Sequence, residues 1–264
     1  MDSLIGDIAA GQLLIRMLAT AVVVIGVAAA VERLGPAVGG ALAGLPIVLG
    51  PGFFFLMREA EAGFVAQAAG YSILSLAATQ LFLLAYIVMA RRVPPLICML
   101  ASGGAWAGAA LVLKALPPLP AVGMAVFAAV TFAAWRTGRG FLRPSTAARR
   151  SENRAMLVAR GLLAGVLVAA VTAMSGRLGP TGSGLLMAFP VGYTVLSITI
   201  HERMGADTAA ATLHSAILGT ISLAGFCGAL ALTATALPAP AAFLAALLVS
   251  LAITTTLARR SRGR

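Results

Sequence analysis

Long apolar runs divide the chain into segments of about 20 residues, the length that crosses a bilayer as an α-helix. Polar and charged residues gather between these runs, and the runs do not alternate apolar with polar positions as the strands of a membrane barrel do. The predicted spans cover residues 14–31, 37–57, 62–90, 94–113, 118–135, 157–175, 180–200, 207–235 and 238–258. The pattern predicts an all-α polytopic membrane protein of about nine transmembrane helices.

Composition strengthens this prediction, because 60% of the 264 residues are hydrophobic and only 10% are charged. A soluble globular domain has roughly 45–50% apolar and about 25% charged residues, so a water-soluble fold is excluded. The two cysteines, Cys98 and Cys227, each lie inside an apolar run without a nearby histidine. They are expected to be small buried side chains, and neither a metal nor another cofactor is predicted.

The charged residues lie at or near the ends of the apolar runs, although the formal net charge is +11. This placement avoids the cost of charge at the bilayer centre, so the basic excess indicates topology and no nucleic acid partner is expected. Basic residues favour the cytoplasmic side, so the loop 136–160 with its seven arginines is placed in the cytoplasm. Nine spans then put fifteen of the nineteen basic residues on the cytoplasmic side of the membrane. The outer set is Arg16, Arg58, Lys114 and Arg177. We therefore expect a multi-pass protein of a bacterial-type inner membrane, with the N-terminus outside and the C-terminus cytoplasmic.

The sequence contains an internal repeat with an offset of 144 residues (177 − 33 = 144). The tetrapeptide Arg-Leu-Gly-Pro at 33–36 recurs at 177–180, and Pro46 aligns with Pro190. Without gaps, 21 of the 79 positions in 16–94 are identical in the second copy. Roughly 9 identities are expected by chance from this composition, so we interpret the repeat as a duplication.

Each copy holds four spans, the first within 1–117 and the second within 157–264, and 118–156 forms a linker helix and a basic cytoplasmic loop. Because four spans return the chain to its starting side, the single linker span turns the second copy upside down. The predicted fold is therefore an inverted 4+1+4 repeat, an arrangement that recurs in secondary transporters. The alternative is that duplication only enlarged a membrane domain, without alternating access.

The second span of each copy is predicted to be an interrupted helix, because Pro46 and Pro190 fall near its middle among glycines. A proline removes a helical hydrogen bond and clashes with the preceding turn. Paired interrupted helices in corresponding positions are the best pointer in a sequence to a transporter's binding site. Half-helix N-termini favour anions and freed carbonyls favour cations. The alternative is a pair of packing kinks.

Polar residues follow one side of the third span in each copy. In the first copy they stand four residues apart: Gln67, Tyr71, Ser75 and Thr79. In the second copy the corresponding stripe is Thr208, Thr212, Ser215, Gly219 and Ser222. These stripes either line a cavity or form ordinary hydrogen bonds between helices. Gln67 and Tyr71 are large polar groups that are costly against lipid, so both are expected to face inward.

We expect a small-molecule solute to bind near the bilayer midplane, between the breaks at Pro46 and Pro190. The candidate substrate-binding residues are Gly44, Pro46, Gly50, Gln67, Tyr71, Ser75, Pro190, Tyr193, Thr194, Ser197 and Ser215. His214 is a candidate proton relay, with a purely structural role as the alternative. Coupling to Na⁺ through carbonyls and hydroxyls, coupling to H⁺ through His214 and no coupling all stay open, as does a homo-oligomer.

The predicted function is secondary transport of a small solute, as importer or exporter, by alternating access between the two repeats. No enzyme is predicted, because the chain lacks paired acidic motifs and a glycine-rich loop with the lysine of a nucleotide site. Ser183 and His214 are placed near opposite faces, which disfavours a serine hydrolase. The alternative is a non-transporting membrane scaffold or assembly factor, and a passive channel is the third hypothesis.

Overall fold

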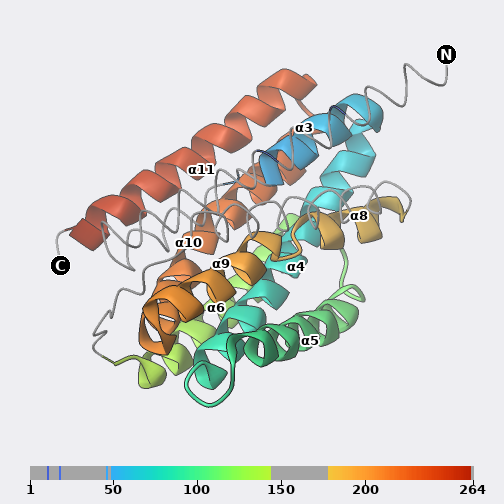
Figure 1. The fold of residues 1–264 in the computed structure, drawn as a ribbon. Coiled ribbons are helices and arrows are strands. Elements are labelled where there is room, and N and C mark those ends of the chain that lie inside the picture. The colour runs from blue at the N-terminus through green and yellow to red at the C-terminus, as the bar shows by residue number, and fades with distance from the viewer. Residues whose placement is uncertain (1–10, 12–17, 19–45, 47–48, 144–177, 263–264) are drawn as a thin grey trace.

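The computed structural model describes residues 11, 18, 46, 49–143 and 178–262 (Figure 1). Within these ranges all regular elements are helices and there is no strand. The elements are α3 (Leu49–Glu59), α4 (Ala62–Met89), α5 (Pro95–Leu113), α6 (Pro120–Gly138), the short 3-10 helix η1 (Arg139–Phe141), α8 (Gly179–Met187), α9 (Val191–Met204), α10 (Ala206–Thr233) and α11 (Ala239–Arg262). Apart from residues 18 and 46, the predicted spans 14–31 and 157–175 and the first half of 37–57 lie outside the described residues.

Six predicted spans are confirmed as helices, at 62–90, 94–113, 118–135, 180–200, 207–235 and 238–258. With α8 and α9 counted as one span, each is long and apolar enough to cross a membrane. Exposed leucines such as Leu111 and Leu248 cover the outer sides of α5 and α11, where they contact lipid. The described residues therefore form a multi-pass helical membrane protein.

Proline and glycine set several helix ends. α5 and α6 begin with Pro95 and Pro120, at the position where a missing N–H costs no helical hydrogen bond. α9 and α10 are joined by Gly205, whose φ of 87° lies in the left-handed region that glycine tolerates. The N–H of Gly205 donates to the carbonyl oxygen of His201 over 3.0 Å, which closes α9 and lets the chain turn back into α10.

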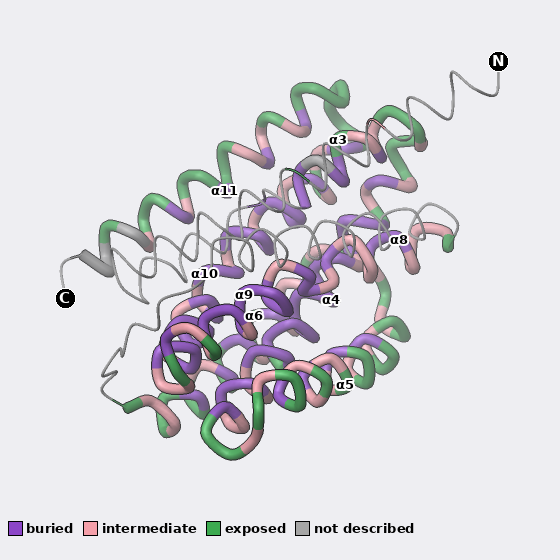
Figure 2. The backbone as a smooth tube through the Cα atoms, viewed as in Figure 1, coloured by how far each residue is buried: buried purple, intermediate pink, exposed green. Residues whose placement is uncertain are grey.

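α4 and α10 form the mostly buried centre of the bundle (Figure 2). Arg91, just after α4, forms an ion pair with Asp207 in the first turn of α10, with 2.5 Å between Nη2 and Oδ1. Nearer the middle, Gln80 Nε2 donates to Thr220 Oγ1 over 2.6 Å. Rising numbers in α4 thus meet falling numbers in α10, so the two helices run antiparallel. Each has 28 residues and is therefore about 42 Å long, longer than a hydrocarbon core of about 30 Å.

The helices around this central pair make corresponding contacts in the two copies. α5 packs on α4 and α9, whereas α11 packs on α10 and α3, and α5 and α11 lie on opposite sides of the bundle (Figure 1). The helix bounds recur with the same offset as the sequence repeat. α10 begins and ends 144 residues after α4 (206 − 62 and 233 − 89), and α11 begins 144 residues after α5 (239 − 95).

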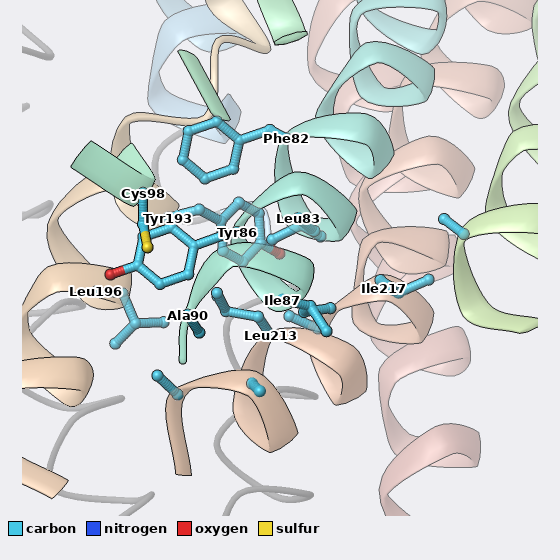
Figure 3. Packing of buried hydrophobic residues seen from close by; sticks show 14 of the residues in the cluster. Phe82, Leu83, Tyr86, Ile87, Ala90, Cys98, Tyr193, Leu196, Leu213 and Ile217 are labelled. Atoms are coloured by element: carbon cyan, nitrogen blue, oxygen red, sulfur yellow. The ribbon is translucent and has the colours of Figure 1, made fainter. Parts of the chain in front are cut away.

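Two apolar clusters fill the bundle. One gathers residues of α4, α5, α6, α9 and α10 around Tyr86, and Figure 3 shows part of it. The other gathers residues mainly of α3, α4, α10 and α11 around Phe53 and Phe226, whose ring centroids lie 6.1 Å apart. Ala188 belongs to the second cluster and Phe189 packs against the first. The end of α8 and the start of α9 are thus held between the two clusters.

Candidate binding site at an interrupted span

The second span of the second copy is interrupted as predicted, at residues 188–190, which we call the α8–α9 break. α8 ends one residue before it, and the chain turns tightly there, since the N–H of Val191 donates to the carbonyl oxygen of Phe189 over 2.7 Å. α9 begins at Val191, directly after Pro190. Because Pro190 has no N–H and its ring clashes with the preceding turn, the helical hydrogen-bond ladder does not pass through it.

Hydroxyl groups of α4 reach two carbonyl oxygens in the last turn of α8, one of which, that of Gly184, also accepts the N–H of Ala188 over 3.4 Å. Ser72 Oγ donates to the carbonyl oxygen of Gly184 over 2.8 Å, and Ser75 Oγ donates to that of Leu185 over 2.8 Å. Together with Thr79 we call these residues the hydroxyl ladder. The three residues come from two neighbouring turns of one buried face of α4, and Ser75 supplies the donor that the carbonyl oxygen of Leu185 lacks within α8.

Thr79 lies beside the break, where its Oγ1 is 3.5 Å from the carbonyl oxygen of Ala188 but donates over the shorter distance of 3.1 Å to the carbonyl oxygen of Ser75 in its own helix. Gly184 brings the helices this close, because a Cβ at that position would overlap the carbonyl oxygen of Ala68 and the Cβ of Tyr71. Ser75 and Thr79, the deeper members of the stripe predicted on the third span, therefore lie beside the α8–α9 break. The hydroxyls of Ser72 and Ser75 occupy the carbonyl oxygens of Gly184 and Leu185, which are then not free to bind a cation.

Tyr193, Thr194 and Ser197, three of the candidate binding residues, lie buried on α9 next to the break. The hydroxyl of Thr194 donates to the carbonyl oxygen of Val191 over 2.6 Å, and that of Ser197 donates to the carbonyl oxygen of Thr194 over 3.0 Å. Both hydroxyls are thus satisfied within α9. Tyr193 packs into the cluster around Tyr86 (Figure 3).

Two hydrogen-bond donors near the start of α9 have no acceptor among the described residues. The indole of Trp106 on α5 packs edge-on against Phe189, with 4.7 Å between ring centroids. Trp106 is 8% exposed, and its Nε1 has no partner among the described residues. No described group accepts the N–H of Gly192, and no described atom lies within 4 Å of a Cβ built there. The carbonyl oxygens of Gly184, Leu185 and Leu186 have donors, whereas these two N–H groups have no described acceptor.

The corresponding span of the first copy is described only from Pro46 onward. Pro46 is buried, its carbonyl oxygen accepts the N–H of Gly50 over 2.6 Å, and α3 begins three residues after it. Gly44 lies outside the described residues, so an interruption at Pro46 stays a prediction. A Cβ at Gly52 of α3 would lie 3.7 Å from Cε of Met187, the last residue of α8. The second spans of the two copies therefore meet beside the α8–α9 break.

Gln67 differs from its prediction. Its side chain is exposed, so the expectation that it faces inward is wrong. Gln67 is the sixth residue of α4, within about 9 Å of the end of a helix that is longer than the hydrocarbon core, and there an amide reaches polar surroundings. Tyr71, one turn deeper, is half-buried and packs against Gly184.

The polar stripe of the second copy behaves differently from that of the first. The hydroxyls of Thr212 and Ser215 donate to carbonyls four residues earlier in α10, over 2.8 and 3.1 Å. Ser222 reaches α11, where its Oγ lies 2.6 Å from Ser250 Oγ and accepts a hydrogen bond from Thr254, and Thr208 donates over 3.0 Å to the carbonyl oxygen of Met204, the last residue of α9. These contacts match the alternative of ordinary helix–helix hydrogen bonds. The binding role predicted for Ser215 is not tested by them.

His214 is buried on α10 and packs beside α6. Its Nε2 donates to the carbonyl oxygen of Trp135 over 3.0 Å, and the two rings stack with an angle of 25° between their planes. Gly138 leaves room for the imidazole, since a Cβ there would lie 3.0 Å from its Cδ2. These contacts fit a structural histidine, and the predicted proton relay stays a hypothesis.

Gln80 is a buried polar residue that the four-residue stripe does not include. Its Nε2 donates to Thr131 Oγ1 of α6 over 2.9 Å and to Thr220 Oγ1 of α10 over 2.6 Å. Its Oε1 has no partner among the described residues. The signal was present in the sequence, because Gln80 is the one amide deep inside the span 62–90. Gln80 follows Thr79 directly and therefore does not fit the four-residue spacing by which the stripe was recognised.

Comparisons with known proteins find no relative: no family model, no curated protein and no solved structure matches the chain. The class of protein is therefore defined by the fold and the site alone. It is a multi-pass helical membrane protein with an interrupted span buried in its bundle.

Proposed function

We propose that the protein is a secondary transporter of a small solute that works by alternating access between two inverted repeats. The observation that carries the proposal is the buried α8–α9 break, beside which α3 of the other copy meets the end of α8. Interrupted helices at corresponding positions of two halves mark the substrate sites of such transporters. The solute binds between the break and the start of α3, in a membrane protein whose C-terminus is cytoplasmic.

Three features of the fold support an inverted repeat. The helix bounds recur with the offset of 144 residues found in the sequence (206 − 62). The corresponding helices α4 and α10 run antiparallel. The half-helix α9 packs on α5, the fourth span of the first copy, and α3 packs on α11, the fourth span of the second copy. Two equivalent halves in opposite orientation provide two equivalent conformations, one open to each side of the membrane. This is the physical basis of alternating access.

The unpaired groups at the break favour a solute with acceptor atoms. The hydroxyl ladder uses the carbonyl oxygens of Gly184 and Leu185, whereas the indole N–H of Trp106 and the N–H of Gly192 have no described partner. The N-terminus of α9 adds the positive end of a helix dipole. We therefore infer that a small monoanion such as a carboxylate is preferred over a cation.

Cysteine labelling at Gly192 tests both the access and the solute class. Gly192→Cys is made in a Cys98→Ala/Cys227→Ala background, since both native cysteines are buried as predicted. A membrane-impermeant maleimide is applied to vesicles of each orientation. We expect labelling from both sides, slowed by acetate but not by its neutral isostere acetamide. Gly104→Cys is the matched control, because that glycine also has open space around it but is exposed on the outer side of α5.

The outcomes separate the steps of the proposal. Labelling of Gly192→Cys from one side only contradicts alternating access, and no labelling from either side contradicts a water-accessible site. Equal protection by acetate and acetamide removes the preference for anions but leaves transport standing. Labelling of Gly104→Cys at the same rate means that the reagent reaches the lipid-facing surface and does not report a cavity.

The second candidate function is a non-transporting scaffold or assembly factor. It is favoured by the hydroxyl ladder, because carbonyl oxygens held by hydroxyls of a neighbouring helix are also what a permanently packed kink requires. A scaffold of this kind predicts that Gly192→Cys is unreactive from both sides in intact vesicles.

A further inference from the structure

An open pocket of about 670 Å³ lies at the end of the bundle where α4 ends and α10 begins. No residue of the α8–α9 break lines it. Its charged and titratable lining comes from four parts of the chain and consists of Arg91, Arg92, Arg143, His201 and Asp207. We call this feature the arginine pocket.

The charges of the arginine pocket are not balanced. Arg91 is committed to Asp207, since its Nε and its Nη2 both lie 2.5 Å from Oδ1 of that carboxylate. Arg92 and Arg143 form no ion pair or hydrogen bond with any described residue. With His201 neutral, three arginines and one aspartate leave a net charge of +2 (3 − 1). The first residues of α10 also line the pocket, and the N-terminal end of a helix adds partial positive charge.

The fold itself does not require these charges. The offset of 144 residues places the same corner at the other end of the bundle, between the end of α10 and the start of α4. There Arg92 corresponds to Ala236 (236 − 92) and Asp207 corresponds to Gly63 (207 − 63). Arg91 and Arg92 therefore have no basic counterparts at the aligned positions of the other corner, where Glu59 and Glu61 stand just before α4.

We propose that the arginine pocket binds a phosphate group, with Arg92 and Arg143 as its charged donors. A guanidinium presents paired N–H groups that match phosphate oxygens, and the excess of two positive charges suits a phosphate anion. The pocket lies at the ends of membrane-spanning helices, the depth of lipid headgroups, where basic pockets between helices bind anionic lipids. The phosphate belongs either to an anionic phospholipid or to a phosphate compound in solution. This inference does not depend on transport.

The test uses the purified full chain in a neutral detergent. Calorimetric titration measures the Kd of dihexanoyl phosphatidylglycerol, a short-chain anionic lipid, and separately that of inorganic phosphate. The double variant Arg92→Gln/Arg143→Gln is expected to weaken binding about 30-fold, since each arginine near such a headgroup contributes a step of about fivefold. The matched control is Arg136→Gln/Arg259→Gln, which removes two exposed arginines of the same end that do not line the pocket.

Each outcome decides a part of the proposal. Binding of the lipid alone identifies a headgroup site, whereas binding of both probes with the same loss in the pocket variant identifies a site for phosphate in general. Equal losses in the two double variants mean that surface charge alone attracts the lipid, which overturns the proposal, as does no binding of either probe. Should the glutamine double variant not fold, Arg92→Lys/Arg143→Lys keeps the charge without the paired N–H groups, and unchanged affinity there also overturns it.

Discussion

Removal of one hydroxyl tests how the α8–α9 break is held inside the bundle. In Ser75→Ala, the carbonyl oxygen of Leu185 loses its partner, the Oγ at 2.8 Å. The helical donor for this oxygen would be the N–H of Phe189, which instead donates to the carbonyl oxygen of Leu186 over 3.0 Å. A buried carbonyl left without a partner costs about 1–3 kcal/mol. We therefore expect Ser75→Ala to lower the free energy of unfolding by about 2 kcal/mol.

Alanine substitutions at two other serines provide comparisons for the loss expected in Ser75→Ala. Ser72→Ala removes an equally short bond to the carbonyl oxygen of Gly184, but that oxygen keeps the N–H of Ala188 at 3.4 Å. We expect a loss of about 0.6 kcal/mol, the average for hydrogen bonds between membrane helices. Ser102→Ala is the matched control, since its Oγ donates within α5 to a carbonyl that lies in a continuous helix. Its expected effect is about 0.5 kcal/mol or less.

Reversible unfolding in mixed micelles of a mild detergent and dodecyl sulfate, followed by circular dichroism, measures all three free energies. The expected order of destabilisation is Ser75→Ala, then Ser72→Ala, then Ser102→Ala. Equal effects of Ser75→Ala and Ser102→Ala would refute the reasoning, because the break would then hold its carbonyls without the hydroxyl ladder.

Two further predictions concern packing and the buried amide. Gly184→Ala should destabilise the protein by about 3 kcal/mol, because the added Cβ overlaps backbone of α4, whereas Gly104→Ala on the exposed side of α5 should be neutral or slightly stabilising in the same unfolding assay. Gln80→Met should change the free energy of unfolding by less than about 1 kcal/mol, because the hydrogen bonds lost are offset by removal of the unpaired Oε1. A loss above about 2 kcal/mol in Gln80→Met would mean that Oε1 has a partner in the membrane-embedded protein.

The spans and the break at Pro190 were predictable because their signals are strong and local. A run of about 20 apolar residues leaves the chain no other stable arrangement in lipid than a helix. A proline near the middle of such a run removes a backbone donor whatever packs around it. The burial of Cys98 and Cys227 followed from the same apolar runs.

The polar contacts were less predictable, because spacing does not tell which partner a short side chain takes. Ser75 donates across to α8, whereas Ser215 on the corresponding helix donates to its own backbone, as serine and threonine in helices readily do. Ser72 lies off the four-residue stripe, yet it reaches α8 because Gly184 lets the two backbones approach. Gln67 lies on the stripe, but its depth in the membrane depends on the length of α4 beyond the hydrocarbon core.

The hydroxyl ladder is not repeated in the second copy, and this bears on the energetics of the proposed transport cycle. At the offset of 144 residues, the positions of Ser72, Ser75 and Thr79 are taken by Ala216, Gly219 and Leu223. α10 therefore has no hydroxyls at these positions to offer the second span of the first copy. Two halves with identical contacts would give two end states of equal free energy, whereas the α8–α9 break has hydroxyl donors on α4 that α10 does not offer to the predicted break at Pro46. Because each 1.4 kcal/mol changes a population tenfold, a carrier built this way rests in one end state until solute binding offsets the difference.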